Sequence, residues 1–419
     1  PTISVVVTNN DDSSTINNTS PPTTTNASAI TATFTTSEVT TDFVSSHVVV
    51  NGGSLDSFSG SGTTYTAVIT PSSSIVRINV SANRFTDAVG NLNTALTQFV
   101  MFSDTTAPTL SEVTPVPTPD NDNTPSYTFT TNETGTLTTS ITEGFTGGAS
   151  VNITSTGNNT VTFAALGDGS YAGKTLTLTD AAGNATNLSI TTFVIDTTAP
   201  SAFTVGAVSS TGNTVVSNYW NSTNTGIDVI VPVASDTSLT GGTIQLRANV
   251  AGGGYENLGD AYTIQGSDLG TNKTISNTAG TFEALSAGLA EGESVAFTAI
   301  ITDSSSNSTT GTASGTTLAV DQTAPTISEQ TVVTTPSNDT TPTFTITSNE
   351  AGAITVSQTI TSPSPANAIS GNTDITFDIL AAGTYNSETV SVRDAAGNDS
   401  NTVTLTTFVI DTTAPSAFT

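Results

Sequence analysis

Hydrophobic and polar residues alternate with a period of two along most of this 419-residue chain. Tyr127 and Phe129, for example, are separated by a threonine. The same spacing pairs Val161 with Phe163, Leu176 with Leu178, Ile375 with Phe377, and Val390 with Val392. Because successive side chains of a β-strand point to opposite faces, the pattern is typical of strands with one buried and one threonine-rich face. No 3.6-residue period is sustained, and no apolar run of about 18 residues predicts a membrane span.

Clusters of Gly, Asn, Asp and Pro separate the alternating segments at short intervals. Seven or so short strands in roughly 90 residues predict a two-sheet sandwich, for which the Ig-like arrangement is the commonest candidate. A signal of the form Asp-x-Thr-Ala-Pro recurs at residues 104–108, 196–200, 321–325 and 411–415. Proline lacks a backbone N–H and pushes its predecessor toward an extended conformation, so we interpret each signal as a linker between consecutive domains. The predicted fold class is all-β, with tandem Ig-like β-sandwich domains joined end to end as a rod.

The linkers divide the chain into two short domains that are near copies, one long domain and one domain of a third type. The predicted boundaries are 1–103 for the third type, 104–195 and 321–410 for the short type, 196–320 for the long type, and 411–419 for the start of a further repeat. Pro1–Ser4 is similar to Pro325–Ser328, the residues that end and follow a linker. We therefore expect this sequence to be a segment of a longer repetitive protein.

The composition excludes several classes of function. The chain has 34 acidic residues against 6 basic ones, and its net charge of −28 repels phosphate backbones and anionic membranes, which excludes nucleic acid as a partner. The charge has two interpretations: it keeps the chain soluble, or many of the carboxylates are cation ligands. The chain has no cysteine, which excludes disulfides and thiolate metal sites and, for an exported protein, favours a bacterial source.

Catalysis is not predicted. The one histidine, His47, stands beside Val48–Val50 and is more typical of a strand than of a Ser–His–Asp site. Glycoside hydrolysis would need a cleft with aromatic walls, but the chain has one tryptophan and 7 scattered tyrosines. For Trp220, next to Tyr219, core packing is the default interpretation and a carbohydrate contact is the alternative. We therefore predict that the protein is not an enzyme.

Three short motifs accompany the linkers. They are the Asn-Asp-Asn-Thr-Pro start at 121–125, the Asn-Glu-x-Gly turn at 132–135 and 349–352, and the Asp-Ala-Ala-Gly-Asn hairpin at 180–184 and 394–398. Together with the linkers, they resemble the bacterial Ig-like repeats of giant secreted surface adhesins. The resemblance is strongest in the two short domains and weakest in the long one, where the hairpin has become Asp303–Asn307. It implies a calcium-stiffened stalk on the bacterial cell surface, whose adhesive domain lies elsewhere in the protein.

Topology predicts where acidic residues of the short domains meet. In an Ig-like sandwich with strands A to G, the chain enters at the end to which the B–C and F–G loops return. Asp104 precedes strand A, Glu133 follows strand B, and Asp180 begins the F–G turn, so we expect the three to converge. Clustered carboxylates are costly without a cation, and calcium takes about six to eight oxygen ligands, so a calcium site is predicted. The alternative is that these residues only form turns and caps.

The candidate calcium ligands lie in linkers and entrance loops. The full set is Asp104, Glu133, Asp180, Asn184, Asp196, Asp303, Asp321, Glu350, Asp394, Asn398, Glu38 and Asp87. Asp321, Glu350 and Asp394 are the second short domain's counterparts of the first triplet. A further site at the exit end stays open, with Asp120, Asp122 and Asp168 near Asp196, and with Asp339 and Asp411 as counterparts. Ca²⁺ is the predicted cofactor.

The sequence favours a structural stalk or filament segment of a large extracellular bacterial adhesin, made rigid by calcium between domains and supporting cell-surface adhesion and biofilm formation. The expected partners are other repeats of the same chain, whereas surface glycans or neighbouring cells would be contacted through domains outside this segment. Two alternatives stay open. Either the domains themselves bind a glycan, ice or a partner cell, or they assemble laterally into an extracellular sheath or fibre through exposed strand edges.

Overall fold

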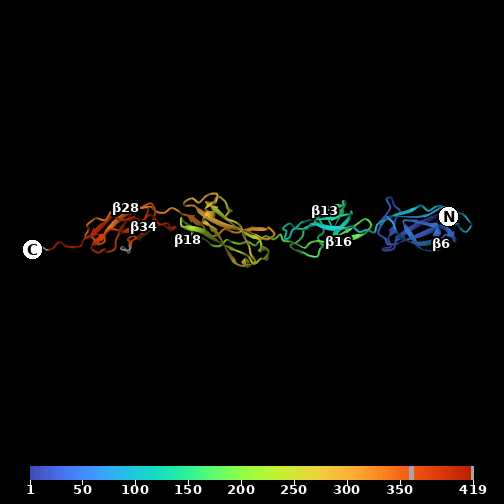
Figure 1. Ribbon diagram of the computed structural model, residues 1–419, viewed down its shortest axis with the longest axis horizontal. Coiled ribbons are helices and arrows are strands. Elements are labelled where there is room, and N and C mark those ends of the chain that lie inside the picture. The colour runs from blue at the N-terminus through green and yellow to red at the C-terminus, as the bar shows by residue number, and fades with distance from the viewer. Residues whose placement is uncertain (358–362, 417–419) are drawn as a thin grey trace. The chain divides into compact units, whose positions relative to one another are not determined.

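The computed structural model describes residues 1–357 and 363–416, so the end of the predicted further repeat, 417–419, lies outside the described residues. The chain forms two units, residues 1–197 and 198–419, and each is described by itself. The predicted all-β class is confirmed, because strands dominate the described residues, as Figure 1 shows. The exceptions among them are a short helix, α1 (Ala279–Glu283), and the 3-10 turns Ser45–His47, Thr237–Leu239 and Gly266–Asp268. Within these residues, no helix is long and apolar enough to cross a membrane.

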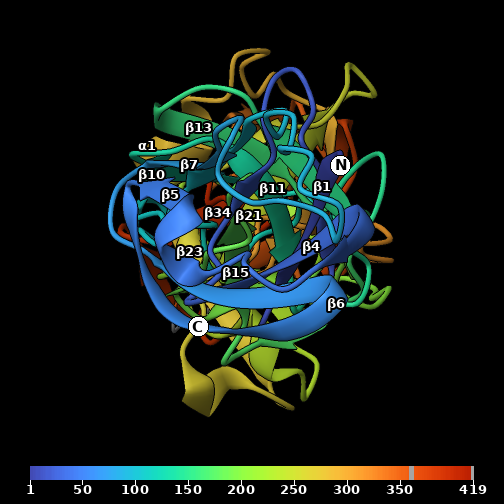
Figure 2. The same cartoon turned by 90° about the vertical axis from the view of Figure 1, so that its right-hand side faces the viewer.

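The first domain is a sandwich of two four-stranded sheets, with strand orders β2-β1-β4-β6 and β3-β8-β7-β5. Its strands are β1 (Ile3–Asn9), β2 (Thr15–Ile16), β3 (Thr24–Thr25), β4 (Ile30–Thr40), β5 (Val48–Asn51), β6 (Gly53–Pro71), β7 (Ile75–Val80) and β8 (Phe99–Ser103). β1 pairs with β4 and β4 with β6 in antiparallel register. Figure 2 shows the three strands on one side of the first domain. Along β4, Ile30, Ala32 and Phe34 are buried while the threonines between them are partly exposed, which is the alternation predicted for a half-buried strand.

The second domain completes the first unit. It has a three-stranded sheet of order β13-β10-β9, a four-stranded sheet of order β12-β11-β15-β16 and the pair β14-β17. Its strands are β9 (Leu110–Thr114), β10 (Ser126–Thr131), β11 (Gly135–Thr139), β12 (Ser150–Ile153), β13 (Gly157–Thr162), β14 (Gly169–Tyr171), β15 (Thr175–Thr179), β16 (Ala185–Ser189) and β17 (Phe193–Ile195). Tyr127 and Phe129 of β10 are buried in one core with Leu176 and Leu178 of β15, so the apolar face of each strand turns inward.

The second unit begins with the long domain. Its sheets have the orders β18-β20-β24 and β19-β27-β25-β21-β22, with β23 paired to β21 and β26 paired to β25. Its strands are β18 (Val208–Gly212), β19 (Tyr219–Trp220), β20 (Asn224–Pro232), β21 (Thr243–Val250), β22 (Glu256–Asn257), β23 (Tyr262–Thr263), β24 (Asn272–Thr278), β25 (Ser294–Thr302), β26 (Ser308–Thr310) and β27 (Leu318–Val320). Trp220 is fully buried and meets Phe282 edge to face at a centroid distance of 4.9 Å. Its ring therefore packs in the core and is not available to stack on a sugar.

The fourth domain has the same sheet plan as the second. Its sheets have the orders β28-β29-β32 and β31-β30-β34-β35, with the pair β33-β36. Its strands are β28 (Ile327–Thr331), β29 (Thr343–Ser348), β30 (Gly352–Val356), β31 (Asn367–Ala368), β32 (Gly371–Thr376), β33 (Gly383–Tyr385), β34 (Thr389–Arg393), β35 (Val403–Thr404) and β36 (Phe408–Ile410). The two short domains thus share a topology as well as their sequence motifs.

Each domain has its own hydrophobic core. The buried apolar residues form four clusters, and each lies within one of the segments 1–103, 104–195, 196–320 and 321–410. His47 belongs to the first domain, where its ring stacks on Phe43 at a centroid distance of 6.3 Å. That contact gives the lone histidine a packing role.

Separate cores predict separate unfolding. Phe344 is fully buried in the fourth domain, and its replacement by alanine should cost about 3–5 kcal/mol of unfolding free energy. We expect the fourth domain of Phe344→Ala to unfold at a lower temperature than that of the wild type. Hydrogen exchange resolved by peptide measures this unfolding. The third domain, reported by Trp220 fluorescence, should melt as in the wild type. Equal destabilisation of both domains would show that their cores are not independent.

Candidate metal centre

Three carboxylates from distant parts of the sequence meet at one end of the second domain. Asp104 belongs to the linker, Glu133 to the loop between β10 and β11, and Asp180 to the turn between β15 and β16. One carboxylate oxygen of each residue lies within 4.8 Å of the other two, and all three residues are half-buried. The structure therefore brings together the triplet for which the sequence predicts a shared site.

The hairpin that carries Asp180 is shaped by local hydrogen bonds. Asp180 Oδ1 accepts from the backbone N–H groups of Ala182 at 2.8 Å and Asn184 at 2.9 Å. Gly183 adopts a φ of +96°, a conformation that favours glycine. Asn184 Nδ2 donates to Asp180 Oδ2 and to the carbonyl of Asp104, both at 2.9 Å. Turn formation and a metal site are therefore compatible here, because the turn itself holds the carboxylate of Asp180 in place.

The fourth domain repeats the arrangement with Asp321, Glu350 and Asp394, whose carboxylate oxygens also lie within 4.8 Å of one another. Asn398, which is 1% exposed, donates from Nδ2 to Asp394 Oδ2 and to the Asp321 carbonyl, both at 2.9 Å. Asp394 Oδ1 accepts from the backbone N–H of Asn398 at 2.9 Å. Two domains with different neighbours thus build the same cluster from equivalent residues.

The side-chain amides of Asn184 and Asn398 are not oriented as those of the cation ligands that we predict from the sequence. In both residues, the amide NH₂ group rather than the oxygen faces the carboxylates. An NH₂ group that donates to a carboxylate has no lone pair to offer a cation, so these residues position the carboxylates instead. The residue type alone does not reveal this orientation, because it depends on which groups the turn places around the amide.

Burial and mutual repulsion raise the pKa of several of these carboxyls. Burial, followed by its two acidic neighbours in the cluster, raises the pKa of Glu133. The pKa of Asp321 rises to about 6, first through burial and then through Asp394 and Glu291. Burial, Asp394 and Glu291 likewise raise the pKa of Glu350. The clusters therefore favour either protonation or a bound cation over three free negative charges.

A fourth carboxylate, which the sequence pattern does not reveal, joins the cluster of the fourth domain. Glu291 belongs to the long domain, in the loop before β25, and it shares a hydrogen bond with Asp321. Glu291 Oε2 also accepts from the N–H of Gln322 and the hydroxyl of Thr323, both at 3.0 Å. Its one sequence signal is the short acidic stretch 291–293, which gives no indication that the contact crosses a domain boundary.

In the first domain, the structure brings two of the predicted ligands together. Glu38 lies within hydrogen-bonding reach of Asp87, and hydrogen bonds, above all from the side chain of Asn91, lower the pKa of Asp87 to about 2. No third carboxylate joins this pair in the part of the chain that the structure describes. In the long domain, Asp303 is buried and closes its own turn, since its Oδ1 accepts from the N–H of Asn307 at 2.9 Å.

The carboxylates at the exit end of the second domain also form local turns. Asp120 Oδ1 accepts from the N–H of Asp122 at 3.0 Å, and Asp168 Oδ1 accepts from the N–H of Thr197 at 2.9 Å. Within residues 1–357 and 363–416, no group of three carboxylates is found at this end, and the exit site stays a prediction. Asp196 stays a predicted ligand, because it lies in the first unit whereas the long domain that it precedes lies in the second.

Residues 2–103, the two-sheet sandwich at the N-terminal side, match the family model of the bacterial Ig-like domain. The match covers the first domain. Its sheets of order β2-β1-β4-β6 and β3-β8-β7-β5 are the sandwich that the resemblance of the sequence motifs implies. No curated protein matches the chain.

Three solved structures align with the chain at low sequence identity. Domains A168–A170 of titin are 9% identical with a TM-score of 0.31, over 73% of this chain and 97% of that chain. A 1.5-MDa bacterial ice-binding adhesin is 17% identical with a TM-score of 0.28, over 73% of this chain and 99% of that chain. The D1–D4 ectodomain fragment of ICAM-5 is 10% identical with a TM-score of 0.34, over 97% of this chain and 99% of that chain.

The raised pKa of Asp321 predicts a pH dependence of stability when no cation is bound. A carboxyl with a pKa of 3.8 in the unfolded chain and about 6 in the folded one favours folding when it is protonated. This contribution is complete below about pH 4 and is lost as the pH rises through about 6. In chelator, we therefore expect the melting temperature of the fourth domain to fall between about pH 5 and pH 7, and Asp321→Asn to reduce that fall.

Scanning calorimetry across this range, with Asp374→Asn as the control, measures the effect. Asp374 is an exposed carboxylate on β32, where it accepts from the Thr345 hydroxyl at 2.7 Å, outside the cluster. Groups whose pKa is lowered, such as Asp399 beside Arg393, are ionised in both states over this range and do not contribute. The same pH dependence in wild type and Asp321→Asn would rule out Asp321 as its source.

Proposed function

We propose that this chain is a segment of the stalk of a large extracellular bacterial adhesin, and that calcium bound at the junctions between domains makes the stalk rigid. One observation carries the proposal. In both short domains, a linker aspartate, a B–C loop glutamate and an F–G turn aspartate place carboxylate oxygens within 4.8 Å of one another. The tandem sandwiches, with a bacterial Ig-like domain among them, support a structural role. Function then lies in the spacing and stiffness of the array rather than in a reaction.

The donor set fits a calcium ion. Calcium prefers hard oxygen ligands and takes about six to eight of them from carboxylates, backbone carbonyls and water. Asp321, Glu350 and Asp394 offer three carboxylates, and Glu291 offers a fourth from the preceding domain. The cluster brings together no sulfur or imidazole group of the kind that softer metals prefer.

The position of each cluster gives a cation a mechanical effect. Asp104 and Asp321 are linker residues, whereas the other carboxylates of each triplet belong to loops of the domain that follows. A cation bound by all three would fasten the linker to that domain and neutralise the repulsion among them. Without the cation, ionised carboxylates favour arrangements in which the linker moves away. Bending at the junction is therefore restricted when the cation is bound.

The proposed sites suit an extracellular environment. Extracellular calcium modules typically bind with a Kd of about 10⁻⁴–10⁻³ M, so they are loaded outside the cell and empty during synthesis inside it. Each sandwich has an apolar core that needs no metal, so the domains fold before calcium is met. The partners that we propose are other repeats of the same chain, with glycans or neighbouring cells contacted by domains outside this segment.

The proposal predicts that calcium straightens and stiffens the chain. We expect the maximum dimension from small-angle scattering to increase when calcium is added at roughly millimolar concentration, and to revert in chelator. The radius of gyration should exceed, in every condition, the value of about 22 Å expected for a compact domain of 419 residues. Sodium chloride in chelator should not replace calcium, because screening lowers repulsion without supplying a bridge. Identical scattering curves in all three conditions would refute calcium stiffening.

A matched pair of charge variants separates calcium binding from net charge. Asp394→Asn removes a carboxylate of the cluster, whereas Asp374→Asn removes an exposed one on the same domain. We expect Asp394→Asn to weaken calcium binding at this junction at least about tenfold and to lose part of the stiffening. Asp374→Asn should behave as the wild type does. Equal effects of the two variants would mean that the cluster serves only turn formation and solubility.

A further inference from the structure

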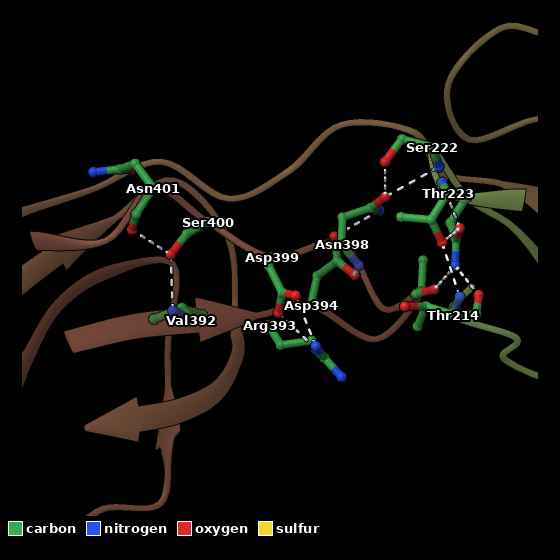
Figure 3. Close-up of polar contacts among 12 residues, drawn as sticks. Thr214, Ser222, Thr223, Val392, Arg393, Asp394, Asn398, Asp399, Ser400 and Asn401 are labelled. Atoms are coloured by element: carbon green, nitrogen blue, oxygen red, sulfur yellow. Dashed lines mark hydrogen bonds and ion pairs between the residues drawn. The ribbon is translucent and has the colours of Figure 1, made fainter. Parts of the chain in front are cut away.

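Asn398 connects the carboxylate cluster of the fourth domain to the long domain before it (Figure 3). Its Nδ2 donates to Asp394 Oδ2, as Figure 3 shows. It also donates to the Asp321 carbonyl. Its Oδ1 accepts two hydrogen bonds from Ser222 of the long domain, one from the backbone N–H at 3.2 Å and one from the hydroxyl at 2.8 Å. The buried side-chain amide of Asn398 therefore has hydrogen-bond partners in the cluster on one side and in the neighbouring domain on the other.

Two further contacts hold the same turn against the long domain. Asn221 Nδ2 donates to the carbonyl of Ala396 at 2.7 Å, and both residues are buried. Gly397 adopts a φ of +94°, and a Cβ there would lie 2.7 Å from Thr214 Cγ2. Glycine is therefore needed for this close approach. The turn 394–398 therefore packs closely against the long domain.

The corresponding junction of the first unit lacks the serine. At the first junction, the N–H of Asp104 donates to the carbonyl of Thr25, which precedes Asn26. At the second, the N–H of Asp321 donates to the carbonyl of Trp220, which precedes Asn221. This shared contact aligns Asn26 with Asn221, and therefore Ala27 with Ser222. Alanine has no hydroxyl to offer Asn184, which occupies the place of Asn398 in the hairpin of the second domain. The serine contact is thus specific to the junction between the third and fourth domains, among the two compared.

We infer that Ser222 is a positioning residue for the cation site of the fourth domain and acts through Asn398. The inference rests on the proposed function, because it gives a residue of the neighbouring domain a part in calcium binding. The two donors on Oδ1 restrain the amide whose Nδ2 faces Asp394 and the linker, an orientation that Asn184 adopts without a serine. This added restraint keeps the carboxylates at the spacing that a cation needs. Docking of the two domains and binding of calcium therefore favour each other, by the same factor in both directions.

Terbium luminescence sensitised by Trp220 reports on this site. Trp220 is the one tryptophan of the chain, and its carbonyl accepts from the N–H of Asp321 at 2.9 Å. Terbium occupies oxygen-rich calcium sites, so its displacement by calcium gives an apparent Kd in the full 419-residue chain. We expect Ser222→Ala to weaken calcium binding about three- to tenfold, the effect of one hydrogen bond.

Two control variants separate the hydroxyl from other effects. Ser222→Thr keeps the hydroxyl at an exposed position, and Ser217→Ala removes an exposed hydroxyl elsewhere in the same domain. Both should bind calcium within about twofold of the wild type, because neither removes the hydrogen bond to Asn398. In chelator, Trp220 fluorescence should give the same melting temperature for wild type and Ser222→Ala, because the substitution lies outside the hydrophobic core.

The outcomes are distinguishable. Equal calcium affinity in wild type and Ser222→Ala would overturn the inference and leave the proposed function intact. A Ser222→Thr variant as weak as Ser222→Ala would also overturn it, since the hydroxyl would then not be the cause. A lowered melting temperature of Ser222→Ala in chelator would assign the serine a structural role in its own domain and contradict the inference. Failure of the wild type to bind terbium or calcium would refute the proposed function itself.

Discussion

The entrances of the two short domains are constrained by carboxylates that the fold holds close together, where like charges repel. Asp321 shows it most clearly, because burial and three acidic neighbours raise its pKa to about 6. The sheet topology brings the linker, the B–C loop and the F–G turn to one end of each short domain, and the hydrogen bonds of Asn184 and Asn398 fix the turn. The repulsion therefore persists while the linker stays hydrogen-bonded to the turn. A divalent cation bound among the carboxylates would relieve this repulsion.

Much of the fold could be predicted because its signals are periodic or local. The alternation of apolar residues with threonine locates strands such as β10 and β15, and the repeated linker marks where one sandwich ends. The carboxylate triplets could be predicted as well, since Ig-like topology determines which loops share an end. The contacts of Glu291 and Ser222 could not, because they cross a domain boundary to residues that no local pattern connects with them. The hydrogen bonds from Ser222 to the amide oxygen of Asn398 escaped prediction for the same reason, since they also cross a domain boundary.

The two junctions differ in how much of the connection the protein itself makes. Between the third and fourth domains, Asn221, Ser222 and Glu291 all form hydrogen bonds with the linker or the domain that follows. Between the first and second domains, Ala27 replaces the serine, and the N–H of Asp104 donates to the carbonyl of Thr25. If calcium binds as proposed, it carries more of the connection at the first junction, and protein contacts carry more at the second. An array that alternates such junctions would contain joints of unequal stiffness.

Crystallography of the chain grown with calcium, using the anomalous signal of the ion, tests the central claim most directly. We predict a cation bounded by Asp321, Glu350 and Asp394, with oxygen ligands at about 2.3–2.6 Å, and a second one at the equivalent carboxylates of the second domain. Carboxylates that surround only water at calcium concentrations of roughly 10⁻³ M would contradict the claim that a cation joins the linker to the domain that follows.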